Sequence, residues 1–215
     1  MSFLRHSKRW SGPLPVALVR LKLVKLDSYF TKGFGVRICE TRLMINQPKN
    51  REIMKKELIN KQEIKLIGLT ARTNNKNEMN PQTSKIGELA GRFWSQNIAN
   101  QIPHRENPGV TLSVYAEYES NEHGDYTYFI GEEVSSFENM PAGLQRLTIP
   151  ASKYQRFTTS SGTMPEVVIN AWQQIWKMTS DDFEGERAYF ADFEVYDQRA
   201  VDPAHTILDI YIGIK

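Results

Sequence analysis

The most constraining feature of this sequence is a succession of predicted elements that occurs twice. The first copy contains a strand, a helix and two further strands, at 64–71, after Pro81, at 110–118 and at 126–134. The second copy repeats this order, at 144–157, after Pro165, at 187–196 and at 207–214. The two helices align at a spacing that pairs Trp94 with Trp176. Internal similarity on this scale indicates two units related by a pseudo-twofold axis.

The hydrophobic periods support these elements and predict the fold class. In the first helix Ile86, Leu89, Ala90 and Phe93 follow the i, i+3, i+4, i+7 spacing of one buried face. The segment 110–118 alternates between apolar and polar residues, as a strand does. Each unit then has strands covered by one helix, which is an α+β arrangement. We therefore predict two strand-helix-strand-strand units that form antiparallel sheets around a central cleft, a preferred place for a small-molecule site.

The composition is that of a globular protein. The chain has 215 residues, of which 40% are hydrophobic and 24% charged, and these values exclude intrinsic disorder. Cys39 is the only cysteine, so no internal disulfide can form. The mean hydropathy is −0.49, and no apolar run is long enough to span a bilayer. The apolar stretch 13–19 is not followed by a secretory cleavage site, so we predict a cytoplasmic location.

Charge divides the chain into two segments. Residues 1–62 carry 14 Lys and Arg against 4 Asp and Glu, whereas residues 63–215 carry 13 against 21. The basic segment has three interpretations: a leader or extension that need not be native, a nucleic-acid-binding arm, or a DNA-binding helix-turn-helix. Repeated Pro and Gly residues argue against the last, and we expect no direct DNA binding. We predict that the native chain starts at Met54 and that the functional domain has repeats at about 63–140 and 144–215.

Six short segments together resemble the effector-binding domains of the gyrase-inhibitory-protein-like superfamily. This superfamily includes the drug-sensing domains of bacterial AraC- and MerR-type multidrug regulators, and stand-alone proteins. The segments are Ile67-Gly-Leu-Thr-Ala71, Asp125-Tyr-Thr-Tyr-Phe-Ile-Gly-Glu-Glu-Val134, Pro150-Ala-Ser-Lys-Tyr154, Ala171-Trp-Gln-Gln-Ile-Trp176, Phe193-Glu-Val-Tyr-Asp197 and Leu208-Asp-Ile-Tyr-Ile212. Their common order over about residues 63–215 is a specific signal, although no one segment is decisive. We find no fused DNA-binding module, so the resemblance does not imply direct regulation of transcription.

The resemblance implies a cleft between the two units, with aromatic walls and a carboxylate at its base that pairs with cationic drugs. The family's acidic position lies in the pattern Phe-Glu-x-Tyr, which makes Glu194 the carboxylate here. Relatives often have Trp after the Leu of the first helix, where this chain has Ala90, with Trp94 one turn later. The implied function is multidrug-type binding of small, amphipathic, cationic organic molecules. Two alternatives remain: a hydrolase of electrophilic small molecules that uses the same carboxylate, and a gyrase-inhibitor-like protein-interaction module.

The residues themselves suggest how such a site would work. An ionised carboxylate in apolar surroundings must pair with a cation or take up a proton. Glu194 lies among large side chains on its predicted strand, so an organic cation could supply the partner, with each cation–π contact adding about 0.5–2 kcal/mol. The simpler interpretation is a glutamate that faces solvent or pairs with a lysine. The residues that we predict to bind ligand are Glu194, Trp172, Trp94, Tyr115, Tyr128, Phe190 and Tyr196.

Other kinds of chemistry find little support. The four histidines, His6, His104, His123 and His205, are scattered without the spacing of metal ligands. No Gly-x-Ser-x-Gly elbow and no phosphate-binding glycine loop occurs. We therefore predict no catalytic residue, no metal and no cofactor, and favour a binding role over an enzymatic one. The expected partner is the small-molecule ligand; the sequence does not identify a protein partner, whether transcription machinery or gyrase, and we expect no membrane association.

Overall fold

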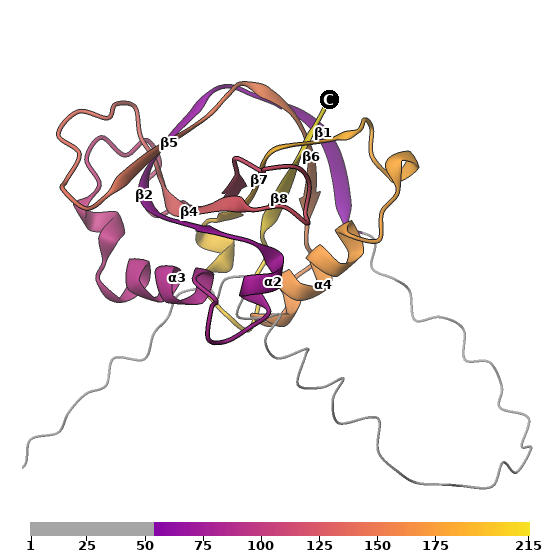
Figure 1. The fold of residues 1–215 in the computed structure, drawn as a ribbon, viewed down its shortest axis with the longest axis horizontal. Helices are drawn as coiled ribbons and strands as arrows, with labels where there is room; N and C mark the ends of the chain where they lie inside the picture. Colours follow the sequence, from indigo (N-terminus) through magenta and orange to yellow (C-terminus); the bar gives the residue numbers. More distant parts are fainter. Residues whose placement is uncertain (1–53) are drawn as a thin grey trace, which may run out of the picture.

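The computed structural model describes residues 54–215, which form one antiparallel sheet with helices packed against it (Figure 1). The eight strands are β1 (Lys55–Lys61), β2 (Ile64–Thr73), β3 (Thr111–Ala116), β4 (Tyr126–Glu133), β5 (Gln145–Ile149), β6 (Ser152–Thr158), β7 (Arg187–Tyr196) and β8 (Asp209–Ile214). The α-helices are α2 (Asn75–Glu78), α3 (Ile86–Ser95) and α4 (Glu166–Ile175), and short 3₁₀ turns are η1 (Ile98–Gln101), η2 (Ser180–Asp182) and η3 (Gln198–Ala200). The α+β prediction is confirmed. The proposals for residues 1–53 lie outside the described residues.

The sheet order shows the predicted twofold relation between the units. The order is β1-β6-β8-β7-β3-β4-β2-β5, so each strand of one half has a counterpart at the same distance from the β7–β3 junction. The first strand of each unit is exchanged. β1 precedes β2 in the chain but pairs with β6, and β5 precedes β6 but pairs with β2. The repeating unit is therefore strand-strand-helix-strand-strand, which has one strand more than the sequence pattern indicates.

Two boundaries differ from the sequence prediction for identifiable reasons. The segment 144–157, predicted as one strand, is two strands separated at Pro150 and Ala151, because proline cannot donate to a ladder and ends β5. The strand β1 lies inside the range that we assigned to the basic leader. Its side chains are half-buried or exposed at the edge of the sheet, so its composition resembles that of a charged leader. The sheet begins at Lys55.

The two faces of the sheet carry two separate apolar clusters. Because successive side chains of a strand point to opposite faces, Ile67 and Leu69 of β2 join the cluster under the helices, while Leu66 joins the other. α3 and α4 lie on the same side of the sheet (Figure 1), and their buried residues Phe93 and Trp172 belong to the first cluster. No helix among residues 54–215 is both long and apolar enough to cross a membrane.

An irregularity in β7 changes which side chains share a face. The pairing of β7 with β8 shifts register between Arg187 and Asp192, and Tyr189 has a φ of 52° in the left-handed region. A bulky residue rarely adopts that conformation, and such a bulge re-aims the neighbouring side chains. Phe190 consequently packs on Tyr154, in the cluster away from the helices, with ring centroids 5.5 Å apart.

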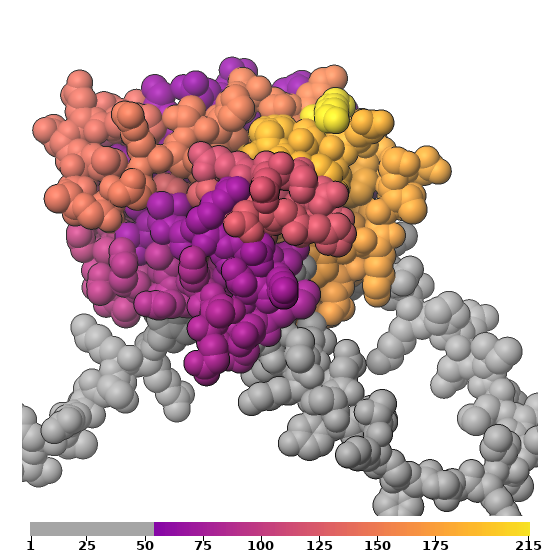
Figure 2. Space-filling model, viewed as in Figure 1, coloured from indigo at the N-terminus to yellow at the C-terminus, as the bar shows by residue number. Residues whose placement is uncertain are grey.

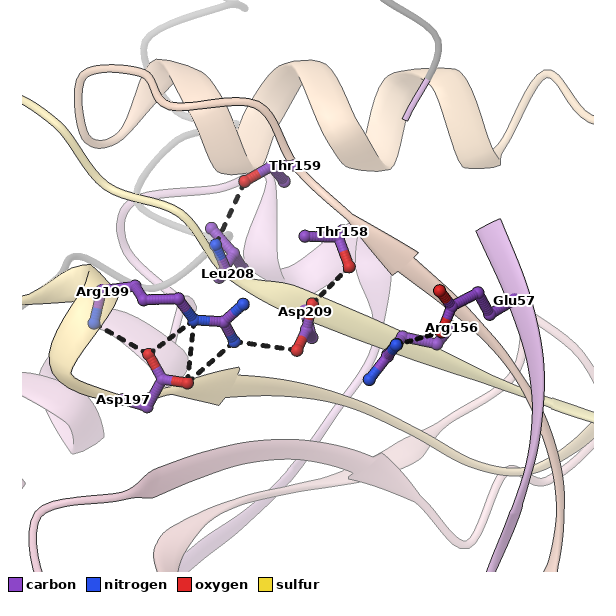
Figure 3. A network of polar contacts seen from close by, with 8 residues as sticks. All are labelled: Glu57, Arg156, Thr158, Thr159, Asp197, Arg199, Leu208 and Asp209. Atoms are coloured by element: carbon purple, nitrogen blue, oxygen red, sulfur yellow. Dashed lines mark hydrogen bonds and ion pairs between the residues drawn. The ribbon is translucent and has the colours of Figure 1, made fainter. Parts of the chain in front are cut away.

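Polar contacts link β1, β6, β8 and the segment around η3 (Figure 3). Asp209 of β8 accepts hydrogen bonds from Thr158 of β6 at 2.6 Å and from the Arg199 guanidinium at 2.8 Å. The same guanidinium pairs with Asp197, and Arg156 pairs with Glu57 of β1. These acids have cations within the fold, so they serve the structure. Glu194 of β7, described below, differs on this point, because none of the ion pairs among residues 54–215 includes it.

Candidate functional site

The centre of the candidate site is the carboxylate of Glu194, which is fully buried in β7. Three uncharged donors surround it. The Trp172 indole Nε1 donates to Oε1 at 2.7 Å, the Tyr115 hydroxyl donates to the same oxygen at 3.3 Å, and the Tyr196 hydroxyl donates to Oε2 at 2.5 Å. All three donors belong to aromatic side chains. Glu194 is therefore enclosed by rings whose polar ends all point at one carboxylate.

Strand pairing and one helix bring these groups together. β3 pairs with β7 so that Ser113 lies opposite Glu194, and side chains on paired positions share a face. Tyr115 follows Ser113 by two residues on β3, and Tyr196 follows Glu194 by two on β7, so both lie on that face. α4 covers it and places Trp172, with the Tyr115 and Trp172 ring centroids 5.6 Å apart. The site is thus formed where the two units meet.

The electrostatics of Glu194 are unusual for a buried acid. None of the ion pairs among residues 54–215 includes Glu194. Burial raises the pKa of Glu194 to about 7, although the hydrogen bonds from Tyr196, Trp172 and Tyr115 oppose this rise. The same burial and the neighbouring Glu194 charge raise the pKa of Tyr115 and of Tyr196, so both remain protonated donors. Near neutral pH the carboxyl group is divided between its charged and neutral forms.

A cavity opens beside this carboxylate. Its volume is about 470 Å³, including the open space at its mouth, and its lining includes Ile86, Tyr115, Tyr118, Tyr126, Trp172 and Trp176. Polar residues Asn75, Glu78, Glu122 and Arg187 complete the lining. In the space-filling view, α2, the segment between β3 and β4, and the C-terminal half adjoin on the face turned toward the viewer (Figure 2). Residues of both units therefore contribute to one aromatic cavity.

The structure brings together five of the seven residues that the sequence analysis selected. Glu194, Trp172, Tyr115 and Tyr196 are in direct contact, and Tyr128 joins them through its ring, 5.5 Å from that of Tyr115. The Tyr128 hydroxyl lies 3.1 Å from the Ser113 hydroxyl. These residues form a continuous cluster beneath α4.

Trp94 and Phe190 lie elsewhere. Trp94 packs edge-on against Phe93, with ring centroids 5.2 Å apart, near the C-terminal end of α3. The residue of α3 that lines the cavity is Ile86, and eight residues of helix separate the two by about 12 Å. Phe190 faces the other side of the sheet because of the bulge in β7. Neither side chain lines the cavity.

Several lining residues were missed by the sequence analysis. Tyr118 and Glu122 follow β3, in a stretch that the sequence suggests to be a solvated strand end and turn. Glu78 ends α2, a helix too short to give a periodic signal; its carboxylate accepts hydrogen bonds from the backbone N–H groups of Lys85 and Ile86, at the start of α3. The turn residues near Asn121 were the one sequence feature that could have pointed to these lining residues, because loops beside a cleft often carry function.

Asp192 is a second buried acid on the same strand and face as Glu194. Its Oδ2 accepts from the Arg187 guanidinium at 2.7 Å and from the Tyr118 hydroxyl at 3.0 Å, and its Oδ1 accepts from the Gly213 N–H at 3.0 Å. Arg187 also lies over the Tyr189 ring, 4.4 Å from its centroid. Asp192 thus has an internal cation, whereas Glu194 has none in the part of the chain that the structure describes.

These groups determine what the site can do. No group of three or more His, Cys, Asp or Glu within residues 54–215 has the arrangement of a metal site. The cluster offers a buried carboxylate, ring faces and hydroxyl groups beside a cavity formed by two units. This combination suits non-covalent capture of an organic molecule, because flat rings contact many shapes and the carboxylate supplies one charged anchor. Fold and site together have the features of a small-molecule-binding domain.

Comparison with known proteins identifies the family. Residues 57–214 match the family of integron-associated effector binding proteins, and the chain belongs to this family. YobU of Bacillus subtilis (strain 168), named as a candidate transcriptional regulator, is 30% identical over 151 residues, which are 70% of this chain and 92% of YobU. The effector-binding resemblance seen in the sequence is confirmed.

Solved structures show the same fold. The integron cassette protein VCH_CASS2 of Vibrio cholerae has a TM-score of 0.61 and 26% identity, covering 74% of this chain and 95% of its own. SAV2435, solved bound to tetraphenylphosphonium, has a TM-score of 0.59 and 17% identity, covering 75% of this chain and 94% of its own. The arrangement of strands and helices is therefore shared with solved proteins that are only 17% and 26% identical to this chain.

Proposed function

We propose that this protein binds small amphipathic organic cations in the cavity beside Glu194. One observation carries the proposal: Glu194 is fully buried, receives hydrogen bonds from three aromatic side chains, and has no cation among residues 54–215. A buried carboxylate without a counter-ion is unfavourable when ionised. A ligand cation would supply the missing charge, and the rings of Tyr115 and Trp172 would contact its apolar groups.

The relatives support the chemical class of the ligand. SAV2435 was solved with tetraphenylphosphonium, a cation whose charge is enclosed by phenyl rings. Five of the ten residues that line the present cavity are aromatic, and two of these, Tyr115 and Trp172, donate hydrogen bonds to the Glu194 carboxylate, so such a ligand would match both features. In its biological setting the protein would sense or sequester such molecules, as the regulator named among its relatives suggests.

The test compares a charged and a neutral ligand of similar shape. Tetraphenylphosphonium and triphenylphosphine oxide are titrated calorimetrically at pH 8 into the wild type and into Glu194→Gln. We expect the variant to lose tenfold or more in affinity for the cation, because charge pairing is lost, and to change by less than about twofold for the oxide. Glu138→Gln, at an exposed position outside the cavity, makes the same change in net charge and should leave both affinities intact. Equal losses for the two ligands would refute charge pairing at Glu194.

A further inference from the structure

The cavity contains a second polar region, at Arg187 and Glu122, that the cation-binding role leaves unused. Both residues line the cavity. Among the described residues, the Arg187 Nε and the Glu122 Oε2 are buried atoms with no hydrogen-bond partner. A buried donor or acceptor left unpaired is unfavourable, so native structures contain few of them. Arg187 and Glu122, each with one unpaired atom, line the same cavity, so a ligand group that enters between the two side chains would pair with both atoms.

The surrounding contacts hold these two groups in place. Arg187 is fixed by its ion pair with Asp192 and lies over the Tyr189 ring. Glu122 is fixed through its backbone carbonyl, which accepts from the Asn75 side chain at 2.6 Å. Burial raises the pKa of Glu122, but hydrogen bonds from Tyr189 and from its own backbone and the charge of Arg187 outweigh this, so its pKa is lowered and it stays ionised. Tyr189 thus interacts with both Arg187 and Glu122.

The backbone at this point is strained. Tyr189 has a φ of 52°, which is unfavourable for a bulky aromatic residue. Without the register shift in β7, Arg187 and Asp192 would lie on opposite faces, because they are five residues apart. The bulge therefore brings Arg187 to the cavity, at a cost in backbone energy. Strained conformations of this kind concentrate at ligand sites.

We propose that Arg187 and Glu122 form a second recognition point, which binds an amide-like group of the ligand at the Arg187 side of the cavity while Glu194 binds its cation. The Arg187 Nε donates to the carbonyl oxygen, and the Glu122 carboxylate accepts from the amide N–H. This inference rests on the proposed cation site and makes it more specific: a cation with a hydrogen-bonding group binds more tightly than a purely apolar cation of the same length.

Three ligands of matched length isolate the two hydrogen bonds. Benzamidoethyl-trimethylammonium carries an amide, benzoylcholine carries an ester with a carbonyl but no N–H, and 4-phenylbutyl-trimethylammonium carries neither. Each is titrated into the wild type at pH 8. We expect the ester to bind about tenfold more tightly than the alkyl cation, because hydrogen bonds to charged groups are the stronger ones. The amide should gain a further factor of about three to ten. Equal affinities for all three ligands would overturn the inference.

Two variants assign each gain to its residue. Arg187→Lys keeps a cation beside Asp192 but has no Nε, so it should reduce the ester-to-alkyl ratio to about one. Glu122→Ala should abolish the amide-to-ester gain and leave the ester-to-alkyl ratio unchanged. If Arg187→Lys fails to fold, the combined Arg187→Met and Asp192→Asn variant removes both charges together and is expected to show the same ratio. A preference for the ester that survives both substitutions would contradict the role of Arg187.

The same titrations separate this inference from the proposed function. Binding of the alkyl cation depends on Glu194 alone, so its loss in Glu194→Gln supports the cation site whatever the other ratios are. If the alkyl cation binds the wild type and Glu194→Gln equally, the proposed function fails. If none of the three ligands binds, the cation site and the second recognition point are both overturned.

Discussion

Asp192 and Glu194 lie two residues apart on one strand and one face, and both are completely buried. Their surroundings nevertheless differ in one respect. Asp192 has the Arg187 guanidinium at 2.7 Å, whereas the partners of Glu194 within residues 54–215 are the neutral donors of Tyr115, Trp172 and Tyr196. At both sites burial raises the pKa, but at Asp192 the positive charge of Arg187 opposes it. The fold thus pairs one acid with an internal cation and leaves the other without a cation among residues 54–215.

Burial alone therefore does not identify a carboxylate that binds ligand. Glu132 is also buried, and it pairs with Arg105 and accepts from the Gly109 N–H. A carboxylate with an internal cation and backbone donors is a structural element, because its removal leaves unpaired partners. A carboxylate with hydroxyl and indole donors alone keeps an uncompensated charge. That uncompensated charge, which is absent at Asp192, makes Glu194 the functional candidate.

The largest effect on stability is expected from breaking the ion pair between Arg187 and Asp192. Arg187→Met leaves the buried Asp192 without its cation and should lower the free energy of unfolding by about 3–5 kcal/mol, as measured by urea denaturation at pH 8. The combined Arg187→Met and Asp192→Asn variant removes the unpaired charge and should recover most of that loss. A loss that the second substitution does not reduce would show that Arg187 stabilises the fold through packing, and not through Asp192.

At Glu194 we expect the opposite effect on the free energy of unfolding, because removing its charge should stabilise the protein at high pH. A glutamate whose pKa is about 7 in the folded state and 4.5 in the unfolded state binds a proton more tightly when folded. Its effect on stability is therefore most favourable below pH 4.5 and is lost as pH rises to about 7, in total by about 3 kcal/mol. Glutamine does not titrate, and its amide can hydrogen-bond to the Tyr196 hydroxyl.

Glu194→Gln should thus gain stability relative to the wild type as pH rises. Urea denaturation of both proteins between pH 4 and pH 8.5 measures the difference in unfolding free energy. We expect this difference to move by about 3 kcal/mol in favour of the glutamine variant across that range. The matched charge control is again the exposed Glu138→Gln, for which the difference from the wild type should stay nearly constant. A pH-independent difference for Glu194→Gln would mean that Glu194 does not titrate in this range.

Ligand binding should also depend on the ionisation of Glu194. In the proposed site a cation pairs with the ionised form of Glu194, so cation affinity should fall about tenfold for each pH unit below 7 and level off above 7. The affinity for triphenylphosphine oxide should not change. Calorimetry in buffers of different ionisation enthalpy would detect the proton released on cation binding near pH 6.5. Cation affinity that is constant from pH 5 to pH 8 would exclude Glu194 as the ionisable partner.

Much of the fold follows from patterns that depend on local sequence. The apolar stripes of α3 and α4 and the alternation in β3 identify their elements, because each period reflects one buried face. The exchange of β1 and β5 between the units is different. An edge strand of lysines and half-buried residues has almost no local signal, and its partner, β6, lies far away in the chain. Such long-range pairing is not visible in local periodicity.

The site was predictable where regular strand geometry applies. Tyr196 shares a face with Glu194 because the two are two residues apart in β7, and Trp172 lies on the buried stripe of α4. The bulge limits this reasoning. A regular β7 would place Phe190 on the face of Glu194 and Arg187 on the other, whereas the left-handed Tyr189 reverses both positions. A single backbone irregularity therefore removed one predicted residue and concealed the Arg187–Asp192 pair.

The smallest expected effect comes from removing one neutral donor of Glu194. The Tyr196 hydroxyl is the largest of the hydrogen-bonding influences that lower the pKa of Glu194. Tyr196→Phe deletes it with little change in volume, so the pKa of Glu194 should rise by about one pH unit, equivalent to about 1.4 kcal/mol. The midpoint of the pH profile for cation binding should shift upward by the same amount, while affinity at pH 9 stays nearly unchanged.

The corresponding change at the other acid provides the control. Tyr118→Phe removes the hydroxyl that donates a hydrogen bond to Asp192 Oδ2 at 3.0 Å, but it leaves the Arg187 cation in place. It should therefore leave the midpoint for cation binding unchanged, because the charge that a ligand neutralises belongs to Glu194. If Tyr118→Phe shifts the midpoint as much as Tyr196→Phe does, the two acids titrate together and the distinction between a paired and an unpaired carboxylate fails.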